Sequence, residues 1–246
     1  MCLFRRAREK GSATVGCSCV VVAAGRSERM QGIEKVLYPL LGVPVLIRTL
    51  QALSACEEIS EIIVVTREDL LVPVSDICKD ACLDKVRKIV VGAADRAGSV
   101  RCGLREIDPS AQLVAVHDAA RPFVTPEVVR EAILTAARTG AAAPAVRVKD
   151  TVKVVGEDGM VDHTPPRETL WAVQTPQVFD ADLLRGALIK AEEDGAALTD
   201  DCSAVERIGM KVTLTPGCEE NIKLTTPVDL ACAEAIISWR ERGGDT

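Results

Sequence analysis

The sequence predicts an α/β protein with a Rossmann-like, mostly parallel sheet, helices on both of its faces, and a β-hairpin arm. Short apolar runs rich in β-branched residues alternate with helical patterns along most of the chain, as is typical of such a sheet. Small or charged residues follow several of these runs, at the edge where open parallel sheets bind ligands. The alternation stops after Val148, where a turn-rich segment indicates a hairpin that leaves the sheet.

Length and composition favour one domain with a large core. The 246 residues are 48% hydrophobic, and we expect a tail over residues 1–17 and one domain over 18–246, with an arm at about 148–170. The net charge of −6 gives no general attraction to nucleic acid or anionic membranes, and no apolar run approaches a membrane span. The ten cysteines include no C-x-x-C pair, so we interpret them as free thiols in a reducing cytoplasm.

Strands and helices alternate through the first 140 residues. Apolar runs predict strands at 19–22, 62–65, 86–91 and 113–116. Helical patterns occur at 44–53, 100–107 and 125–140. The last of these helices has the clearest bounds, because Thr125 and Pro126 form a typical helix start and Gly140 a typical end.

The later part of the chain departs from this pattern. The tetrapeptide Gly156-Glu157-Asp158-Gly159 lies between extended runs at 151–155 and 160–163, and therefore predicts a β-hairpin. An isolated two-stranded hairpin is marginal in water, so we expect the arm to pack against a second copy of the chain in a homodimer. The remaining predicted elements are a strand at 170–175 and helices at 183–191 and from Thr226 onward.

The segment after the first strand is the first candidate ligand site. Gly25 and the small residues before it allow close backbone approach, and Arg26, Arg29 and Lys35 follow, which suits an anionic ligand. The chain has neither G-x-G-x-x-G nor G-x-x-x-x-G-K-[ST], which excludes a dehydrogenase-like dinucleotide fingerprint and a P-loop. Taken alone, the segment is equally compatible with an ordinary turn that carries solvated basic residues.

Further polar residues follow other predicted strands. Arg96 and Ser99 supply hydrogen-bond donors in a run of small residues, although that run is also a plausible helix start. Asp118 either orients hydroxyl groups, holds Mg²⁺, or forms a structural pair with Arg121. Lys223 lies in what we interpret as an apolar strand end, where a lysine is costly unless it meets an anion.

The order of these motifs is more specific than any one of them. The segments are Ala23-Ala24-Gly25 through Lys35, Arg96 to Ser99, His117 to Pro122, Asp150-Thr151, Gln174-Thr175-Pro176-Gln177, Leu198-Thr199-Asp200 and Asn221-Ile222-Lys223. Together they resemble the sugar-phosphate nucleotidyltransferases, and within these the 2-C-methyl-D-erythritol 4-phosphate cytidylyltransferase family. The resemblance covers nearly the whole chain from about Ser18 onward.

The resemblance implies an enzyme that joins CTP and 2-C-methyl-D-erythritol 4-phosphate with Mg²⁺ and releases pyrophosphate, in non-mevalonate isoprenoid precursor biosynthesis. It also implies a homodimer in which the arm of one subunit reaches the active site of the other. Matching positions give a catalytic role to Arg29, Lys35 and Lys223, nucleotide binding to Ala23, Ala24, Gly25, Ala93 and Ser99, and polyol phosphate binding to Asp118, Thr151, Arg167 and Thr199. Asp118 is also the candidate metal ligand.

The chain departs from the family pattern at two places. Glu34 and Val36 flank Lys35 where the family usually has proline and glutamine, which bears on the rigidity of this loop, and Gly92-Ala93 replaces paired glycines. Two alternatives stay open: a ribitol-5-phosphate cytidylyltransferase and a catalytically silent sugar-nucleotide-binding protein. We favour methylerythritol phosphate because it is the commoner substrate among such relatives, and we expect no fused cyclase domain because the chain ends at Thr246.

Overall fold

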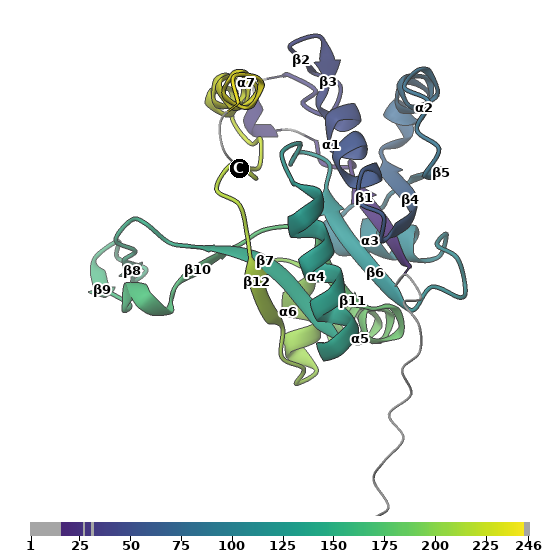
Figure 1. Cartoon of the computed structure of the whole chain (residues 1–246). Helices are drawn as coiled ribbons and strands as arrows, with labels where there is room; N and C mark the ends of the chain where they lie inside the picture. Colours follow the sequence, from purple (N-terminus) through teal and green to yellow (C-terminus); the bar gives the residue numbers. More distant parts are fainter. Residues whose placement is uncertain (1–15, 27, 31, 244–246) are drawn as a thin grey trace, which may run out of the picture.

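A mostly parallel sheet forms the centre of the computed structural model, which describes residues 16–243 except 27 and 31 (Figure 1). Its strands are β1 (Cys17–Val22), β4 (Ile59–Thr66), β5 (Val86–Val91), β6 (Leu113–Asp118), β7 (Ala141–Arg147), β10 (Trp171–Val173), β11 (Gln177–Asp180) and β12 (Thr213–Pro216). They lie in the order β10-β7-β11-β6-β1-β4-β5, with β12 beside β7. Only β10 and β11 pair antiparallel to their neighbours among the described strands of this sheet. The chain order reverses between β1 and β6, and a crevice at such a switch point is where open sheets bind ligands.

Helices cover both faces of this sheet, as predicted (Figure 1). They are α1 (Val45–Ser54), α2 (Leu71–Asp80), α3 (Arg96–Leu104), α4 (Pro126–Thr139), α5 (Ala181–Glu193), α6 (Asp201–Arg207) and α7 (Pro227–Glu241). One core cluster lies under α1, α2 and α4, and a second under α3, α5 and α6. Val21 belongs to the first cluster and Val20 to the second, because successive side chains of a strand point to opposite faces. None of the described helices is long and apolar enough to cross a membrane.

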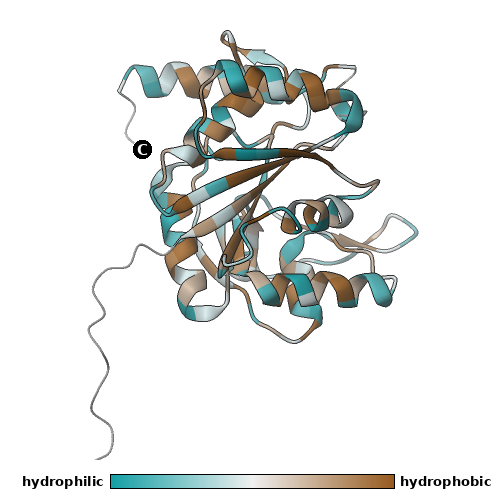
Figure 2. Ribbon diagram, turned by 90° about the vertical axis from the view of Figure 1, so that its right-hand side faces the viewer, coloured by the Kyte–Doolittle hydropathy of each residue, from teal (hydrophilic) through white to brown (hydrophobic). Residues whose placement is uncertain are grey.

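The close approach of α3 to the sheet depends on one glycine. A Cβ atom at Gly103 would lie 2.4 Å from Cγ1 of Val20 and 2.9 Å from Cγ2 of Val65. No side chain fits there without shifting the helix, so Gly103 sets the distance between α3 and strands β1 and β4. The hydropathy view shows the apolar strands enclosed between the helical layers (Figure 2).

The arm leaves the body as the sequence predicts, although its strands are shorter than expected. The short elements of the chain are η1 (Glu28–Met30), β2 (Pro39–Leu40), β3 (Val43–Pro44), η2 (Glu68–Leu70), β8 (Val154–Val155), β9 (Val161–His163) and η3 (Arg167–Thr169). Strands β8 and β9 form the hairpin of the arm, which extends away from the sheet (Figure 1). At its base, the Arg147 guanidinium lies 4.5 Å from the centre of the Trp171 ring.

Most predicted elements are confirmed, with local reasons that the sequence already contained. Helix α4 begins after Thr125, whose side chain accepts the Val128 N–H at 3.4 Å, and it ends at Gly140 in the left-handed conformation (φ 84°). Strand β5 has the predicted bounds, and the predicted helix starts at 44 and 226 correspond to the caps of α1 and α7.

The structure corrects three predictions. Lys223 does not lie on a strand: residues 221–224 form a loop that the Leu224 N–H to Ala120 O bond (2.8 Å) ties to the end of β6. The predicted strand at 170–175 stops at Val173. Strands β7, β11 and β12 and helices α2 and α6 were not predicted; the alanine run of β7, for example, carries few β-branched residues. Strand β1 already starts at Cys17, inside the predicted tail, and residues 1–15 of that tail lie outside the described residues.

Candidate active site

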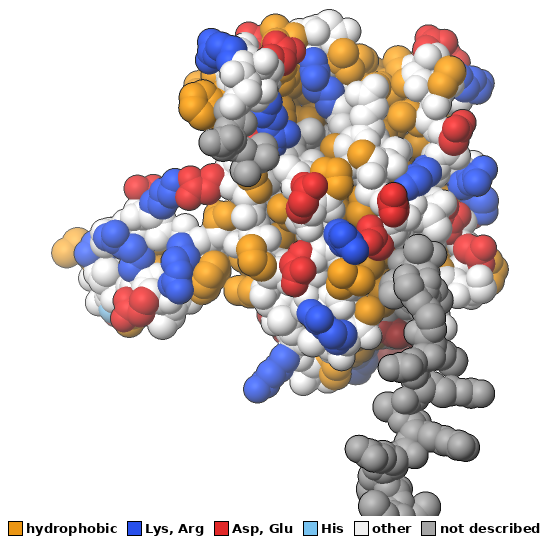
Figure 3. Space-filling model, viewed as in Figure 1, with side chains coloured by type: hydrophobic (Ala, Val, Ile, Leu, Met, Phe, Trp, Pro, Cys, Tyr) orange, Lys and Arg blue, Asp and Glu red, His pale blue; other side chains and the backbone are white. Residues whose placement is uncertain are grey.

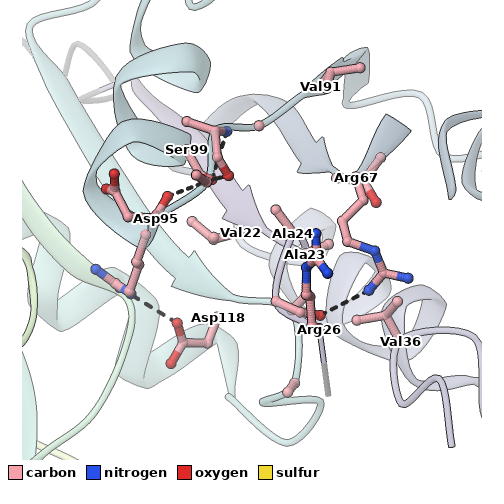
Figure 4. A pocket seen from close by; sticks show the side chains of 18 of the residues that line it. Val22, Ala23, Ala24, Arg26, Val36, Arg67, Val91, Asp95, Ser99 and Asp118 are labelled. Carbon is pink, nitrogen blue, oxygen red and sulfur yellow. Dashed lines mark hydrogen bonds and ion pairs between the residues drawn. The ribbon is translucent and has the colours of Figure 1, made fainter. Parts of the chain in front are cut away.

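A cleft of about 1070 Å³ opens at the carboxyl ends of β1, β4, β5 and β6 (Figure 4). The loop after each of these strands contributes a wall. Eight predicted site residues line it: Ala23, Ala24, Gly25, Lys35, Ala93, Ser99, Asp118 and Lys223. The fold therefore brings together segments that are far apart in the sequence, at the switch point of the sheet.

The loop after β5 forms a fixed wall of this cleft. Ser99 Oγ accepts the Ala93 N–H at 3.1 Å and donates to the Asp95 carbonyl at 2.9 Å. A Cβ atom at Gly92 would lie 2.7 Å from Ser99 Oγ and 3.0 Å from the Cβ of Ala24, so the position needs glycine. Asp95 caps α3 by accepting the Gly98 N–H at 2.7 Å. The buried Ser99 hydroxyl thus shapes the loop backbone.

Asp118 lies among three basic side chains at the other end of the cleft. Its Oδ2 is 2.7 Å from Lys223 Nζ and 3.8 Å from Arg121 Nε, and its Oδ1 is 3.5 Å from Arg96 Nη2. Burial alone would raise the pKa of this carboxyl, but Lys223 and Arg96 outweigh burial and hold the pKa at about 2. Asp118 is therefore ionised, and its nearest partner is Lys223 rather than Arg121.

Lys35 is the cation in this cleft that most favours an anionic ligand. Burial lowers its pKa, and the charges of Lys223 and Arg29 lower it further, while Asp118 and Glu34 oppose the shift. Such a shift means that the charged ammonium is destabilised by desolvation and by like charges. A bound polyanion relieves both, so the cleft favours a ligand with several negative charges.

A buried histidine orders the strand end that carries Asp118. His117 Nε2 is 3.1 Å from the Arg121 carbonyl, and Nδ1 is 3.1 Å from Thr175 Oγ1, which also accepts the Asp118 N–H at 3.2 Å. A carbonyl only accepts, so Nε2 carries the proton and Nδ1 accepts from the Thr175 hydroxyl. Burial lowers the pKa of His117 to about 4, which keeps the ring neutral.

Arg96 connects α3 to α6 through a buried carboxylate. Its Nη1 lies 2.6 Å from Asp201 Oδ2, and Asp201 is only 1% exposed. Gln177 supports this pair, since its side-chain oxygen accepts the N–H groups of Asp201 and Cys202 at 3.1 Å each. Arg96 therefore joins the wall formed by residues 92–99 to the segment that begins α6.

Four predicted site residues lie outside this cleft. Arg29 is exposed on η1, and Thr199 is exposed beside the cap of α6. Thr151 and Arg167 lie together on the arm, where Arg167 Nη2 donates to Thr151 Oγ1 at 2.9 Å. Both are exposed, so the arm presents them as a pair away from the cleft of their own chain.

Sequence reasoning missed Arg67, Asp201 and the roles of His117 and Thr175. Arg67 directly follows β4 and lines the cleft, so the rule that picked out Asp118 could have found it. Asp201 has no such signal, because an acidic residue at a helix start is expected on capping grounds alone. His117 and Thr175 were interpreted only as parts of motifs, and the hydrogen bond between their side chains was not predicted.

Asp118 is the candidate carboxylate for a magnesium ion held mainly by substrate. No three His, Cys, Asp or Glu side chains gather as a metal cluster within the described part of the chain. Mg²⁺ is commonly held by one or two carboxylates together with substrate phosphates, so it does not need such a cluster. Asp118 is ionised and lines the cleft, so it is the residue that could supply such a carboxylate.

Comparison with known proteins gives one consistent family. The model of the 2-C-methyl-D-erythritol 4-phosphate cytidylyltransferase family matches residues 17–239. Proteins of that name are 45% identical over 226 residues in Caldanaerobacter subterraneus subsp. tengcongensis (89% of this chain, 98% of that protein) and 42% identical over 237 residues in Symbiobacterium thermophilum (94% and 97%).

Solved structures agree with these relatives. The 4-diphosphocytidyl-2C-methyl-D-erythritol synthase from Anaerococcus prevotii is similar with a TM-score of 0.80 at 34% identity, over 91% of this chain and 98% of that chain. The 2-C-methyl-D-erythritol 4-phosphate cytidylyltransferase from Thermus thermophilus is similar with a TM-score of 0.74 at 32% identity, over 91% and 99%.

Proposed function

The chain belongs to the 2-C-methyl-D-erythritol 4-phosphate cytidylyltransferase family, and on that premise we propose that its cleft binds CTP and the polyol phosphate side by side. The protein is a nucleotidyltransferase that joins CTP and 2-C-methyl-D-erythritol 4-phosphate and releases pyrophosphate, in the isoprenoid precursor pathway. The observation that carries the assignment to this cleft is that Lys35 and Lys223 both line it beside the carboxyl ends of the central strands, and the lowered pKa of Lys35 supports it.

The reaction requires that the two substrates are positioned and that the charge of the transition state is stabilised. An oxygen of the acceptor phosphate attacks the α-phosphorus of CTP, the new P–O bond forms, and the bond to the β-phosphate breaks with its electron pair on pyrophosphate. Negative charge gathers on the phosphates in the transition state, and preorganised cations lower its energy. Lys35, Arg29 and Lys223 take this role, and neither a nucleophilic side chain nor a general base is required.

The nucleotide base lies against the wall formed by residues 92–99. Ala23, Ala24 and Gly25 leave room for it on one side, and Ala93 and Ser99 bound it on the other. Because Ser99 and Gly92 fix the loop backbone, hydrogen bonds from this wall would be held in one geometry. A fixed set of donors and acceptors discriminates between bases, since the wrong base leaves buried groups unpaired.

Asp118 would hold Mg²⁺ together with phosphate oxygens of the substrates. The ion would neutralise phosphate charge and help to fix the leaving group. Lys223 Nζ lies 2.7 Å from Asp118 Oδ2, so these two charges balance each other. Asp118 also lies where it can accept from hydroxyl groups of the polyol, with Thr199 on the α6 side.

The arm completes the site of a second subunit in a homodimer. It exposes apolar side chains, among them Val155 (57%), Met160 (69%) and Val161 (57%), together with basic side chains (Figure 3). Exposed apolar surface on an isolated hairpin is stabilised by burial against a partner. Thr151 and Arg167 would then reach the polyol phosphate bound by the other chain, which accounts for their distance from their own cleft.

We infer a reducing, cytoplasmic location. All cysteines among the described residues are free, including Cys17, Cys19 and Cys56, which lie close together in the core. Burial raises the pKa of the Cys56 thiol to about 11, so these groups stay protonated and act as small apolar side chains.

Pyrophosphate release with a panel of substrates tests the proposed function. CTP with 2-C-methyl-D-erythritol 4-phosphate should give release that depends on Mg²⁺, UTP should be a poor substrate, and ribitol 5-phosphate should be a poor acceptor. Chelation of the metal should abolish release, and Mg²⁺ should restore it. Equal turnover with ribitol 5-phosphate would reassign the acceptor, and no release with CTP and methylerythritol phosphate would refute the proposal.

A further inference from the structure

Arg67 joins the two ends of the first loop of the cleft. Its Nη1 donates to the Gly25 carbonyl at 3.2 Å, where the loop starts, and its Nη2 lies 2.8 Å from Glu34 Oε2, where the loop ends. Arg67 itself is fixed directly after β4 and points across the cleft toward the first loop (Figure 4). One guanidinium therefore connects both Gly25 and Glu34 to the end of a central strand.

The chain directly after Glu34 is anchored from the other side. Val36 is 2% exposed in the main core, and its carbonyl accepts the Leu46 N–H at 3.0 Å from the first turn of α1. Lys35 therefore lies between Glu34, which pairs with Arg67, and Val36, which is packed in the core. Its position in the cleft depends on both neighbours.

The Glu34–Arg67 pair is partly shielded from water, which makes it stronger than an open surface pair. The two side chains are 25% and 20% exposed, whereas Asp69, the other acidic partner of Arg67, is 66% exposed. Asp69 binds Arg67 through both carboxylate oxygens at 3.0 Å, and it belongs to η2 rather than to the first loop. Glu34 and Asp69 therefore bind the same arginine, but Glu34 attaches the first loop to it and Asp69 attaches η2.

We propose that Glu34 and Arg67 are positioning residues for the transfer reaction: they hold the first loop so that Lys35 meets the phosphates of CTP. The proposal rests on the proposed function, because it needs Lys35 to face the phosphates. Glu34 and Val36 replace the proline and glutamine that the family usually has beside Lys35, and this difference bears on the rigidity of the loop. In the proposed arrangement, the Glu34–Arg67 ion pair supplies that rigidity. The proposal also separates Arg67 from the phosphate-binding cations, since Glu34, Asp69 and Gly25 already occupy its guanidinium.

Steady-state kinetics of single and double variants test this role. Glu34→Ala removes the attachment to the loop, and Asp69→Ala is the matched control that removes the other carboxylate from the same arginine. Displacement of a catalytic group by about 1 Å costs up to about 10²-fold, so Glu34→Ala should lower kcat about tenfold or more with little change in KM for CTP. Asp69→Ala should stay within about twofold of the wild type, as exposed substitutions do.

A double variant of Glu34 and Lys35 distinguishes a positioning role of Glu34 from a contribution that does not depend on Lys35. If Glu34 acts through Lys35, the double variant Glu34→Ala/Lys35→Ala should be no slower than Lys35→Ala alone. Likewise, Glu34→Ala/Arg67→Ala should match Arg67→Ala. Glu34→Gln, which keeps the size of the side chain, serves if Glu34→Ala fails to fold, and circular dichroism checks each variant.

Three results would overturn the proposal: wild-type kcat in Glu34→Ala, an equal loss in Asp69→Ala, or losses that multiply in the Lys35 double variant. A higher KM for CTP in Arg67→Ala, with normal kcat and normal kinetics in Glu34→Ala, would make Arg67 a direct phosphate ligand instead. Failure of the proposed function looks different. In that case Lys35→Ala itself would turn over at the wild-type rate.

Discussion

The buried His117 predicts a specific loss of stability between pH 7 and pH 5. Burial lowers the pKa of the ring from 6.5 to about 4, and the charges of Arg121 and Lys223 contribute, while the Arg121 carbonyl and Asp118 oppose the shift. In this window the unfolded chain binds a proton that the folded chain does not bind. The stabilisation is therefore complete above about pH 6.5 and is lost as the pH falls toward 4.

The magnitude follows from the size of this window. One pKa unit corresponds to about 1.4 kcal/mol, and pH 5 lies about 1.5 units below the unfolded pKa, so lowering the pH from 7 to 5 should cost about 2 kcal/mol. Urea unfolding at the two pH values measures the loss. His117→Gln should remove most of this pH dependence, although the variant itself should be less stable at pH 7 because its contacts to Thr175 and Arg121 change.

The chain offers a matched control in its other histidine. His163 is exposed on the arm, so His163→Gln should keep the full pH dependence of the wild type. All samples need the same protein concentration, since the stability of a dimer depends on it. Equal losses in the wild type and His117→Gln would refute the reasoning, as would an NMR spectrum showing the His117 ring protonated at pH 6.

Three further perturbations follow from the cleft and the arm. Lys223→Ala should lower kcat on the order of 10²-fold, checked by pyrophosphate release; a value near the wild type would limit Lys223 to its pair with Asp118. Gly92→Ala should raise KM for CTP and cost about 1–3 kcal/mol in urea unfolding, because its Cβ would lie 2.7 Å from Ser99 Oγ. Lys35→Ala and Arg167→Ala should each inactivate the enzyme, but co-expression of the two variants should restore about a quarter of wild-type activity. Half of the dimers are then mixed, and each mixed dimer contains one intact site of two. Mixed dimers without activity would contradict the exchanged arm.

Much of the site was predictable because strand ends meet at one edge of a parallel sheet. Asp118 ends β6 and the first loop follows β1, and these two strands pair directly, so their proximity follows from the fold class. Ala93 and Ser99 follow β5 at the same edge. Lys223 was predicted to lie at a strand end and to meet an anion. It lies in a loop instead, but it does meet the Asp118 carboxylate, because the Leu224 N–H to Ala120 O bond ties this loop to the end of β6.

The remainder depends on contacts that no local pattern encodes. Glu34 can pair with Arg67 only when the first loop folds back onto the end of β4. The burial of Val36 in the core fixes the position of the chain beside Glu34. The alanine run of β7 is buried, but it carries few β-branched residues and therefore lacks a strand signature. Propensity alone does not identify such a strand.

Among the basic residues that line the cleft, the direction of the pKa shift differs between Lys35 and two arginines that are paired with carboxylates of the chain. The side chains of Asp69 and Glu34 raise the pKa of Arg67, and for Arg96 the charges of Asp201 and Asp118 outweigh burial and raise the pKa as well. These two guanidiniums are already balanced by carboxylates of the chain. The pKa of Lys35 moves the other way, because burial and neighbouring cations outweigh its acidic neighbours. An incoming triphosphate therefore gains more at Lys35 than at the paired arginines, which would have to give up carboxylates that hold the walls of the cleft in place.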